Sequence, residues 1–460
     1  MSKPQEREEF VPPDGGYGWV VVFANILINS SLLTLVQCFG IIYKDEFSSM
    51  GITAAETSFL LHLHSSLYCS FGFFGSPLLK TYGFRVVAFA GASLMIFGIF
   101  LSSFANSYGF LILSISILIG LGQGILMPAT YLATYTYFKK RLTVAISLSA
   151  TGASLFLIFM PKVCDILLTH VRRKYTVLIL FTISLLSLVG CYLLKTLNTG
   201  SNESDKSVEL LNKNNGKLEE NANVKEEENK LMPNSNPVYR DTTIPAKKEE
   251  SIAQKIYSLF DLELLKQTSY VLVVIGLGIS FAAELNVILM MQFVLPELSG
   301  FLRSDVAFVT SVQYTTDIIG RLAIPLVSHY FEVAPKIMYG GALVAATVAR
   351  TVLALCGKSG TTVYMCCALL GLTKGARAVF QSVIIPKYVP LEKLPAANGL
   401  NMLFTGVVSL MVGPIIGAIH DATNSYVPAL HTASALSCIC VILWVSEFVF
   451  SKCKTVPHDG

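Results

Sequence analysis

Residues 109–137 read GFLILSISILIGLGQGILMPATYLATYTY, a run of 29 residues without a charged side chain. An α-helix needs roughly 20 mostly apolar residues to cross the hydrocarbon core of a bilayer, so this run predicts a membrane-spanning helix. Eleven further segments of the same kind occur, at 17–43, 55–79, 86–105, 142–168, 175–195, 267–294, 305–330, 336–356, 360–385, 395–420 and 427–450. The pattern predicts an all-α membrane protein with twelve transmembrane helices.

The composition is typical of a membrane protein and gives no sign of nucleic-acid binding, a metal site or enzymatic chemistry. Of 460 residues, 53% are hydrophobic and only 14% are charged, whereas a soluble protein has about a quarter charged residues. The net charge of +4 gives no reason to expect a nucleic-acid partner. The ten cysteines fall mostly inside apolar runs, without metal-ligand spacing. Because no phosphate-binding loop, metal cluster or nucleophile arrangement is present, we expect neither an enzyme nor a cofactor or metal.

A polar segment divides the spans into two groups of six. Residues 196–266 are rich in Asn, Glu, Lys and Ser, and such a segment cannot bury enough apolar surface to order itself. We therefore expect a largely disordered loop between two six-helix halves. The predicted organisation is an N-terminal segment, a first half, the central loop, a second half and a C-terminal tail, at 1–16, 17–195, 196–266, 267–450 and 451–460.

The distribution of short basic loops predicts the orientation. An even number of spans places both termini and the central loop on one side of the membrane. The short loops on that side contain Lys80, Arg85, Lys139, Lys140, Arg141, Lys336, Lys387 and Lys393, and those on the other side contain Lys44, Arg172, Arg173, Lys174, Arg303 and Lys358. Cytoplasmic loops carry the excess of basic residues, so the bias, although small, favours cytoplasmic termini and a cytoplasmic central loop.

Three motifs distinguish this chain from other twelve-span proteins. The first span begins Asp14-Gly15-Gly16-Tyr17-Gly18-Trp19, and the fifth begins Tyr137-Phe138-Lys139-Lys140-Arg141. The eighth span contains Asp317-Ile318-Ile319-Gly320-Arg321. In these motifs the chain resembles the monocarboxylate transporter family, which is solute carrier family 16 of the major facilitator superfamily. The resemblance covers nearly the whole chain outside the central loop and implies the fold of that superfamily, with two six-helix halves around a midplane site.

The two motifs at the span ends are predicted to serve folding, insertion and gating rather than substrate contact. Gly15, Gly16 and Gly18 allow the chain to turn, and Trp19 suits the headgroup level of a bilayer. The basic residues Lys140 and Arg141 are expected to act as topology determinants at the inner face.

Asp317 and Arg321 are the pair expected to carry the chemistry. Charged side chains deep in a span are costly and usually mark a pathway or a relay. Residues four apart share one helix face, so this carboxylate and this permanent cation can touch. A substrate carboxylate that took Arg321 as its partner would free Asp317 to accept a proton. The alternative is that the two residues form an ion pair with a structural role only.

Gln37 and Lys374 are two departures from the family pattern. The resemblance implies that proton-coupled members carry a lysine late in the first span, which binds substrate and proton, and that position here is Gln37. Glutamine can donate to a carboxylate but carries neither charge nor a transferable proton. We hypothesise that Lys374, in the tenth span, supplies the missing cation, the alternative being that it extends to the inner interface. Glu284 is a further charged residue, for which Arg350 and Lys374 are candidate partners.

The sequence therefore predicts a secondary transporter of small monocarboxylates or related organic acids, with proton coupling left open by Gln37. The alternatives are a proton-independent facilitator of aromatic amino acids or other larger solutes and, from another class, a non-transporting membrane scaffold or sensor. The expected partners are the lipid bilayer, a small organic anion and protons, with a single-span chaperone glycoprotein implied only by the resemblance. The expected location is the plasma membrane.

Overall fold

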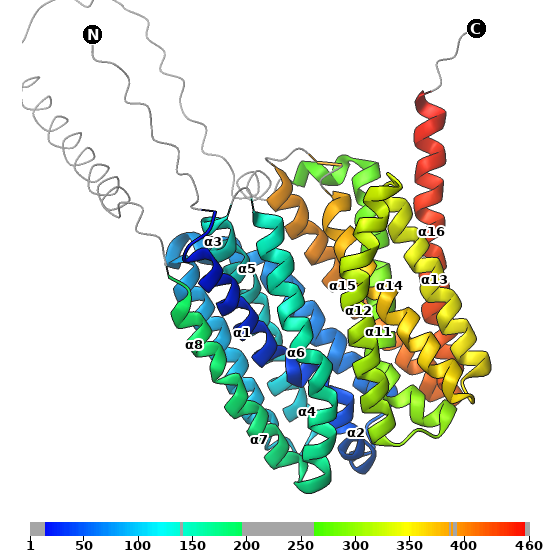
Figure 1. Ribbon diagram of the computed structural model, residues 1–460. Coiled ribbons are helices and arrows are strands. Elements are labelled where there is room, and N and C mark those ends of the chain that lie inside the picture. Colours follow the sequence, from blue (N-terminus) through cyan, green and yellow to red (C-terminus); the bar gives the residue numbers. More distant parts are fainter. Residues whose placement is uncertain (1–13, 139–140, 196–261, 386–387, 390–392, 456–460) are drawn as a thin grey trace, which may run out of the picture. The chain divides into compact units, whose positions relative to one another are not determined.

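The computed structural model describes residues 14–138, 141–195, 262–385, 388–389 and 393–455. All of these residues belong to one compact unit, formed by 12–195 together with 257–460. The described part of the chain is a bundle of helices without strands, and long helices run side by side between its two ends (Figure 1). This confirms the predicted all-α class.

The first half contains helices that correspond to the first six predicted spans. They are α1 (Gly18–Gln37), α2 (Phe39–Met50), α3 (Ala54–Ser102), α4 (Tyr108–Leu111), the π-helix η1 (Ile112–Ile119), α5 (Gly120–Tyr137), α6 (Leu142–His170), α7 (Arg173–Ser184) and α8 (Leu186–Leu193). Two predicted spans are merged in α3, which is interrupted at Gly83 with φ 72° and ψ 159°. A positive φ of this size is accessible chiefly to glycine, so Gly83 permits the turn between them.

The second half follows a short 3₁₀-helix, η2 (Leu262–Lys266). Its six long helices are α11 (Thr268–Ser299), α12 (Arg303–Tyr330), α13 (Pro335–Cys356), α14 (Gly360–Ile384), α15 (Leu394–Thr423) and α16 (Tyr426–Thr455). Most of the predicted central loop, 196–261, lies outside the described residues. We name the two ends of the bundle after residues that lie there, as the Asp14 face and the Gly51 face.

Ten helices of the described residues are long and apolar enough to cross a membrane. The predicted spans 55–79 and 305–330 are helical but are not among these ten. Both helices carry polar side chains that are buried in the protein, such as His62 in α3 and Asp317 in α12. Such residues lower the hydropathy of a helix without exposing charge to lipid. Twelve spans therefore remain a prediction for these two helices.

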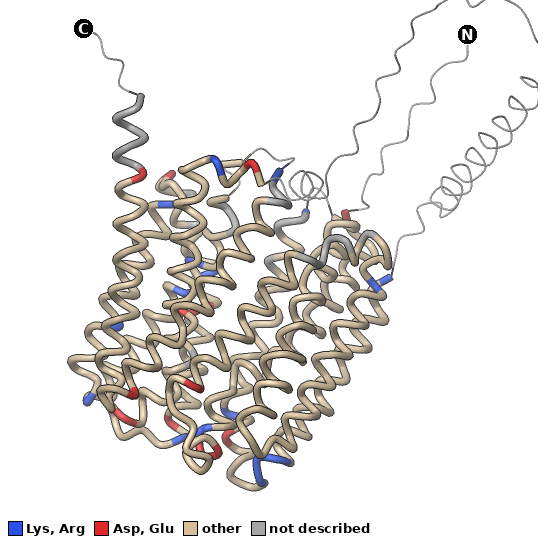
Figure 2. Tube along the Cα trace, turned by 180° about the vertical axis from the view of Figure 1, so that it is seen from behind, with Lys and Arg blue, Asp and Glu red and all other residues tan. Residues whose placement is uncertain are grey.

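Charged residues are concentrated at the two faces of the bundle, with a small group part-way along the helices (Figure 2). The two halves meet mainly along α3 with α15 and along α6 with α12. Glycines make the first contact possible, because a Cβ atom on Gly399 would lie 2.7 Å from the Phe73 ring and one on Gly406 would lie 3.1 Å from Cys69. The halves are thus close-packed along two seams, and the central cavity lies between them.

Candidate functional site

The two signature motifs pack against each other at the Asp14 face. The amide of Asp14 donates to the carbonyl of Tyr137 at 3.0 Å, and the amide of Arg141 donates to the Asp14 carboxylate at 3.1 Å. The rings of Trp19 and Phe138 meet edge-to-face with centroids 5.1 Å apart. These contacts join the start of the first span to the loop between the fourth and fifth.

The same joint extends to the end of the sixth span. The hydroxyl of Tyr17 donates to the carbonyl of Leu193 at 3.0 Å, and that of Tyr137 donates to the carbonyl of Lys195 at 2.8 Å. Gly18 allows this approach, since a Cβ atom there would lie 2.7 Å from the Phe138 ring. Gly15 and Gly16 form the turn before α1, and Lys140 lies outside the described residues. The described signature residues therefore contact one another and the end of the sixth span, and their role in folding stays a prediction.

Replacing Asp14 by Ala should lower the stability of the fold without changing transport per folded molecule. The change removes the carboxylate that accepts from the Arg141 amide, and a hydrogen bond to a charged group contributes about 1.5–3 kcal/mol. The yield of folded protein and its thermal midpoint should fall, while KM stays unchanged. Asp14→Asn keeps an acceptor oxygen and should recover most of the yield. A raised KM in Asp14→Ala would instead place Asp14 in the transport site.

Asp317 and Arg321 form a two-point ion pair on α12. Arg321 Nε lies 3.0 Å from Asp317 Oδ1, and Nη2 lies 3.2 Å from Oδ2. The Asp317 side chain is 2% exposed, whereas that of Arg321 is 25% exposed. The Asp317 carboxylate is thus buried, whereas the Arg321 side chain is partly exposed.

Lys374, on α14, approaches the same carboxylate. Its Nζ atom lies 3.5 Å from Asp317 Oδ2, and its side chain is 16% exposed. It also lies over the ring of Tyr314, 4.8 Å from the centroid, a distance typical of a cation–π contact. The structure therefore brings together two cations and one anion from helices that are about fifty residues apart in the chain.

Glycines at the α12–α14 contact explain how Lys374 reaches Asp317. A Cβ atom on Gly375 would collide with the carbonyl oxygen of Asp317 and would lie 2.9 Å from the amide of Arg321. One turn earlier, a Cβ atom on Gly371 would collide with Thr316 and Gln313. The two helix backbones can lie this close only because both positions lack a side chain.

Gln37 lies beside a local irregularity in the first span, across which the helical hydrogen bonds of Cys38 and Ile42 are kept. Helix α1 ends at Gln37, Cys38 has φ −98° and ψ 12°, and α2 begins at Phe39. The hydroxyl of Tyr314 donates to Gln37 Oε1 at 2.6 Å, and Gln292 Nε2 donates to the Gln37 carbonyl at 3.1 Å. Gln37 is therefore fastened to the second half rather than placed beside Arg321.

These residues line one cavity of about 230 Å³ between the two halves. The first half contributes α1, α5 and α6, and the second contributes α12 and α14. The lining residues include all four predicted site residues, together with other polar side chains: Asn25, Asn29, Thr130, Tyr131, Thr134, Ser149, Ser154 and Tyr314. At this size the cavity is smaller than the roughly 300–1,000 Å³ of sites for drug-sized ligands.

Two further charged residues named in the sequence analysis, Glu284 and Arg350, are not among the residues that line the central cavity. Glu284 forms an ion pair with Arg377 and with neither of its two candidate partners, Arg350 and Lys374. The sequence could not decide this, because Lys374 and Arg377 lie three apart on α14 and only the packing against α11 distinguishes them. Arg350 is fully buried and donates to Ser437 at 2.7 Å. Within the described residues no group of three metal-ligating side chains could hold an ion.

Known proteins resemble this chain in sequence and in fold. The sequence model described as Major Facilitator Superfamily matches residues 18–301. Among similar proteins, monocarboxylate transporter 9 of Pongo abelii is 26% identical over 94% of this chain and 92% of its own length. Human monocarboxylate transporter 1 is 24% identical over 91% of this chain and 82% of its own length.

The chain belongs to the monocarboxylate transporter family of the major facilitator superfamily. Solved structures show the same fold: a POT family transporter in complex with 5-aminolevulinic acid has a TM-score of 0.69 at 12% identity, covering 97% of this chain and 99% of its own. The nucleoside transporter NupG has a TM-score of 0.68 at 10% identity, covering 94% and 100%. This member of the family is therefore a multi-pass membrane protein and a secondary transporter.

Proposed function

We propose that this transporter carries small monocarboxylates by alternating access, with the carboxylate bound between Arg321 and Lys374. The observation that carries the proposal is the charge of the central cluster. Arg321 and Lys374 contribute two positive charges and Asp317 one negative charge, which leaves +1 beside a small cavity. One monoanion neutralises this excess, and unpaired charge in a membrane interior is costly.

The free edge of Arg321 suits a carboxylate. Arg321 uses Nε and Nη2 for Asp317, and within the described residues no hydrogen bond of Nη1 is found. A carboxylate in the cavity can accept from Nη1 and from Lys374 Nζ, and charge-assisted bonds of this kind are the strong ones. Asp317 would position both cations, and Gln37 and Tyr314 would bound the far end of the cavity.

The cluster also bears on proton coupling. When a substrate takes Arg321 as its partner, Asp317 still has Lys374 within 3.5 Å. Charge balance at the site then requires no proton on Asp317. We therefore propose that transport by this carrier does not require a proton gradient, as in the proton-independent alternative. The volume of the cavity, by contrast, favours small substrates over aromatic amino acids.

Uptake of labelled lactate, pyruvate and an aromatic amino acid, each with and without an inward proton gradient, tests both parts of the proposal. We expect lactate and pyruvate to enter at rates that the gradient changes less than about twofold, and the aromatic amino acid to enter poorly. Accumulation driven by the gradient would contradict the proposed independence from protons. Uptake of the aromatic amino acid alone would contradict the small-substrate proposal, and no uptake of any solute would support the scaffold alternative.

Replacing Lys374 by Gln should reduce monocarboxylate uptake strongly. The cluster becomes neutral overall, since Asp317 and Arg321 then cancel, and one of two charge-assisted donors is lost. We expect KM to rise about tenfold, the effect of roughly 1.4 kcal/mol. Lys374→Arg keeps the charge and should retain part of the uptake. Wild-type KM in Lys374→Gln, in protein delivered normally to the membrane, would remove Lys374 from the site.

We also propose a cellular setting for the carrier, in which the bias of basic residues in its short loops sets the orientation. Both termini and the segment 196–266 would lie on the cytoplasmic side of the plasma membrane, and the two halves would rock about the midplane site. Whether delivery depends on a single-span glycoprotein can be tested by expressing the carrier with and without one.

A further inference from the structure

A second and larger cavity, of about 740 Å³, opens at the Gly51 face between the two halves. Its first-half wall is formed by the end of α2 and the start of α3, and its second-half wall by α11, α15 and the start of α16. It shares no lining residue with the central cavity. We call it the vestibule.

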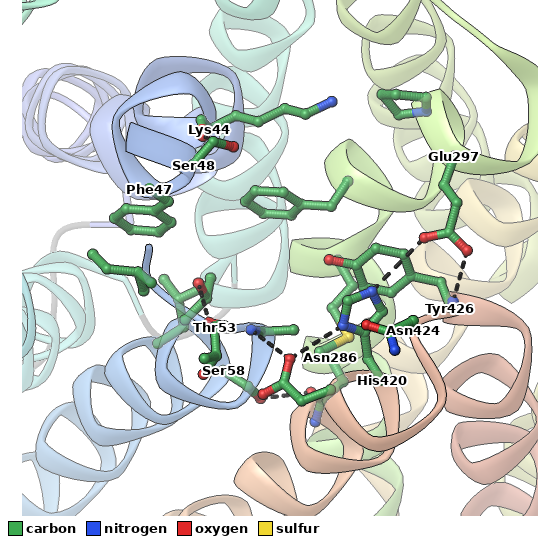
Figure 3. A pocket seen from close by; sticks show the side chains of 18 of the residues that line it. Lys44, Phe47, Ser48, Thr53, Ser58, Asn286, Glu297, His420, Asn424 and Tyr426 are labelled. Carbon is green, nitrogen blue, oxygen red and sulfur yellow. Dashed lines mark hydrogen bonds and ion pairs between the residues drawn. The ribbon is translucent and has the colours of Figure 1, made fainter. Parts of the chain in front are cut away.

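The two walls of the vestibule carry opposite charges. Lys44 extends from α2 towards the wall that carries Glu297 and His420 (Figure 3). Among the described residues no carboxylate lies within 4.0 Å of its ammonium group, although Asp45 is its sequence neighbour. The first-half wall therefore offers a cation whose charge is not cancelled by a direct ion pair.

The opposite wall is acidic and tightly arranged. Glu297 accepts from the amide of Tyr426 at 2.9 Å, and its Oε2 lies 3.8 Å from His420 Nε2. His420 Nδ1 lies 3.3 Å from Asp421 Oδ1, and the His420 ring stacks on Tyr426 with centroids 3.9 Å apart. Two carboxylates are thus fixed around one imidazole and one aromatic ring.

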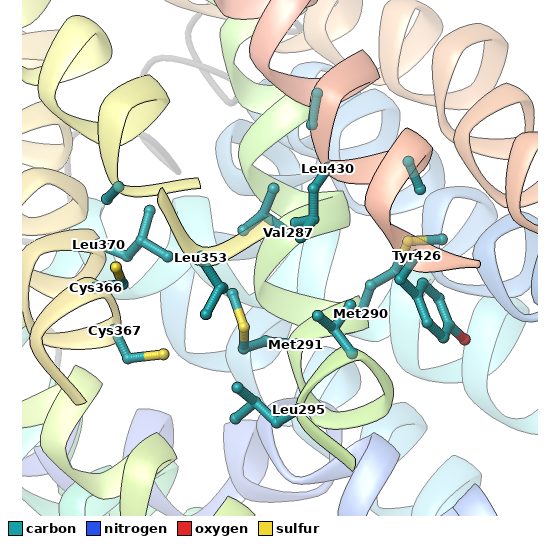
Figure 4. Close-up of a cluster of buried hydrophobic side chains, with 14 of the residues drawn as sticks. Val287, Met290, Met291, Leu295, Leu353, Cys366, Cys367, Leu370, Tyr426 and Leu430 are labelled. Carbon is teal, nitrogen blue, oxygen red and sulfur yellow. The ribbon is translucent and has the colours of Figure 1, made fainter. Parts of the chain in front are cut away.

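The second-half wall is held in place by an apolar cluster behind it. Val287, Met290, Tyr426 and Leu430 belong to a continuous group of buried side chains from several helices of the second half (Figure 4). Across the vestibule, Asp421 accepts from the amides of Ala54 at 2.9 Å and Ala55 at 2.8 Å, at the start of α3. This contact ties the two halves together at the Gly51 face, so the vestibule as described requires both halves.

The geometry points to a binding site for a small zwitterion in the vestibule. A simple organic anion attracted by Lys44 would face Glu297 and Asp421, and a simple amine attracted by the carboxylates would face Lys44. A molecule with an ammonium group at one end and a carboxylate at the other satisfies both walls, and opposite charges at a few ångströms attract substantially in a partly desolvated site. Phe47, Phe293 and Tyr426 cover its apolar middle.

This site is independent of the proposed function, because Arg321 and Lys374 do not take part in it. Since the vestibule is built by both halves, its ligand binds the conformation described here, in which Asp421 contacts the start of α3. A ligand stabilises the state that it binds. Occupation of the vestibule therefore favours this conformation over one in which the two halves have separated at the Gly51 face.

Binding to the purified full-length carrier in lipid nanodiscs tests the site. The probes are 4-aminobutyrate and 6-aminohexanoate, each compared with the matched carboxylate and the matched amine, butyrate and butylamine or hexanoate and hexylamine. At least one zwitterion should raise the thermal midpoint and bind at least about tenfold more tightly than either singly charged counterpart. Lys44→Gln and Glu297→Gln should each weaken that binding about tenfold.

Two controls separate the vestibule from other sites. Lys162→Gln removes one positive charge near the same face but outside the vestibule, and it should leave zwitterion binding unchanged. Arg321→Gln should also leave it unchanged, even if monocarboxylate uptake is lost. Equal binding of zwitterion and carboxylate, or binding that survives both Lys44→Gln and Glu297→Gln, would overturn the inference. So would binding that is lost in Arg321→Gln, because the ligand would then occupy the central cavity.

Discussion

Replacing Arg321 by Gln should lower the kcat/KM of monocarboxylate uptake by about 100-fold, which corresponds to about 3 kcal/mol. The substitution removes the guanidinium edge that faces the cavity and breaks the two-point pair with Asp317, whose atoms lie 3.0 and 3.2 Å apart. The charge of the cluster falls from +1 to zero, because Lys374 then only cancels Asp317. The site loses both its strongest donor and its attraction for an anion.

The matched variant Arg321→Lys separates charge from geometry. Lysine keeps the +1 cluster but lacks the planar fork of arginine, so it cannot hold Asp317 and a substrate carboxylate through separate edges. We expect uptake between that of wild type and that of Arg321→Gln. Initial rates across a range of lactate concentrations, normalised to the amount of carrier at the membrane, provide the measurement. If Arg321→Gln transported lactate as well as wild type, the proposed carboxylate site would be wrong.

Replacing Gly375 by Ala should disrupt the central cluster without removing any of its charged groups. The change adds one carbon atom where α12 and α14 meet. The new Cβ would collide with the carbonyl of Asp317 and lie 2.9 Å from the amide of Arg321, both on the facing helix. Backbone atoms cannot turn aside as a side chain can, so α12 and α14 must separate. Overpacking of this kind costs about 1–3 kcal/mol, and the separation draws Lys374 away from Asp317.

Gly340→Ala on α13 is the matched control. It makes the same chemical change in a helix, but nothing lies within 4 Å of the Cβ position, and alanine is intrinsically the better helix former. Thermal unfolding in detergent or nanodiscs should show a lower midpoint for Gly375→Ala and an equal or higher one for Gly340→Ala. Lactate uptake should fall at least about tenfold in the first variant only, since small displacements at a binding site are costly. Equal midpoints and equal uptake in the two variants would show that the α12–α14 contact is not required.

The spacing of Asp317 and Arg321 in the sequence predicted that these two side chains can touch, and the structure confirms their contact. Asp317 and Arg321 are four apart on one helix, so their contact follows from helix geometry alone. The same reasoning could not place Lys374, because its distance from Asp317 depends on how closely two separate helices approach. That approach depends on Gly371 and Gly375, whose importance appears only when the facing backbone is known.

Contacts between residues far apart in the sequence could not be predicted from it. Glu284 pairs with Arg377 and with neither candidate partner, Arg350 or Lys374. Tyr314 contacts both Gln37 and Lys374, and nothing in the sequence marks it. A tyrosine in an apolar span gives no periodic or charge signal that distinguishes a cavity-lining position from a packing position.

By itself, the sequence determined that this protein is an all-α membrane protein in two halves, and that a carboxylate and a guanidinium lie together in the second half. These features depend on the length of apolar runs and on residues a few positions apart, which the helix relates directly. Only the tertiary structure decided that Lys374 completes a cluster of charge +1, that Gln37 is fastened to Tyr314, and that a vestibule of opposed charges lies between the halves. Those features depend on the packing of helices distant in sequence, where the absence of a single Cβ atom determines which side chains meet.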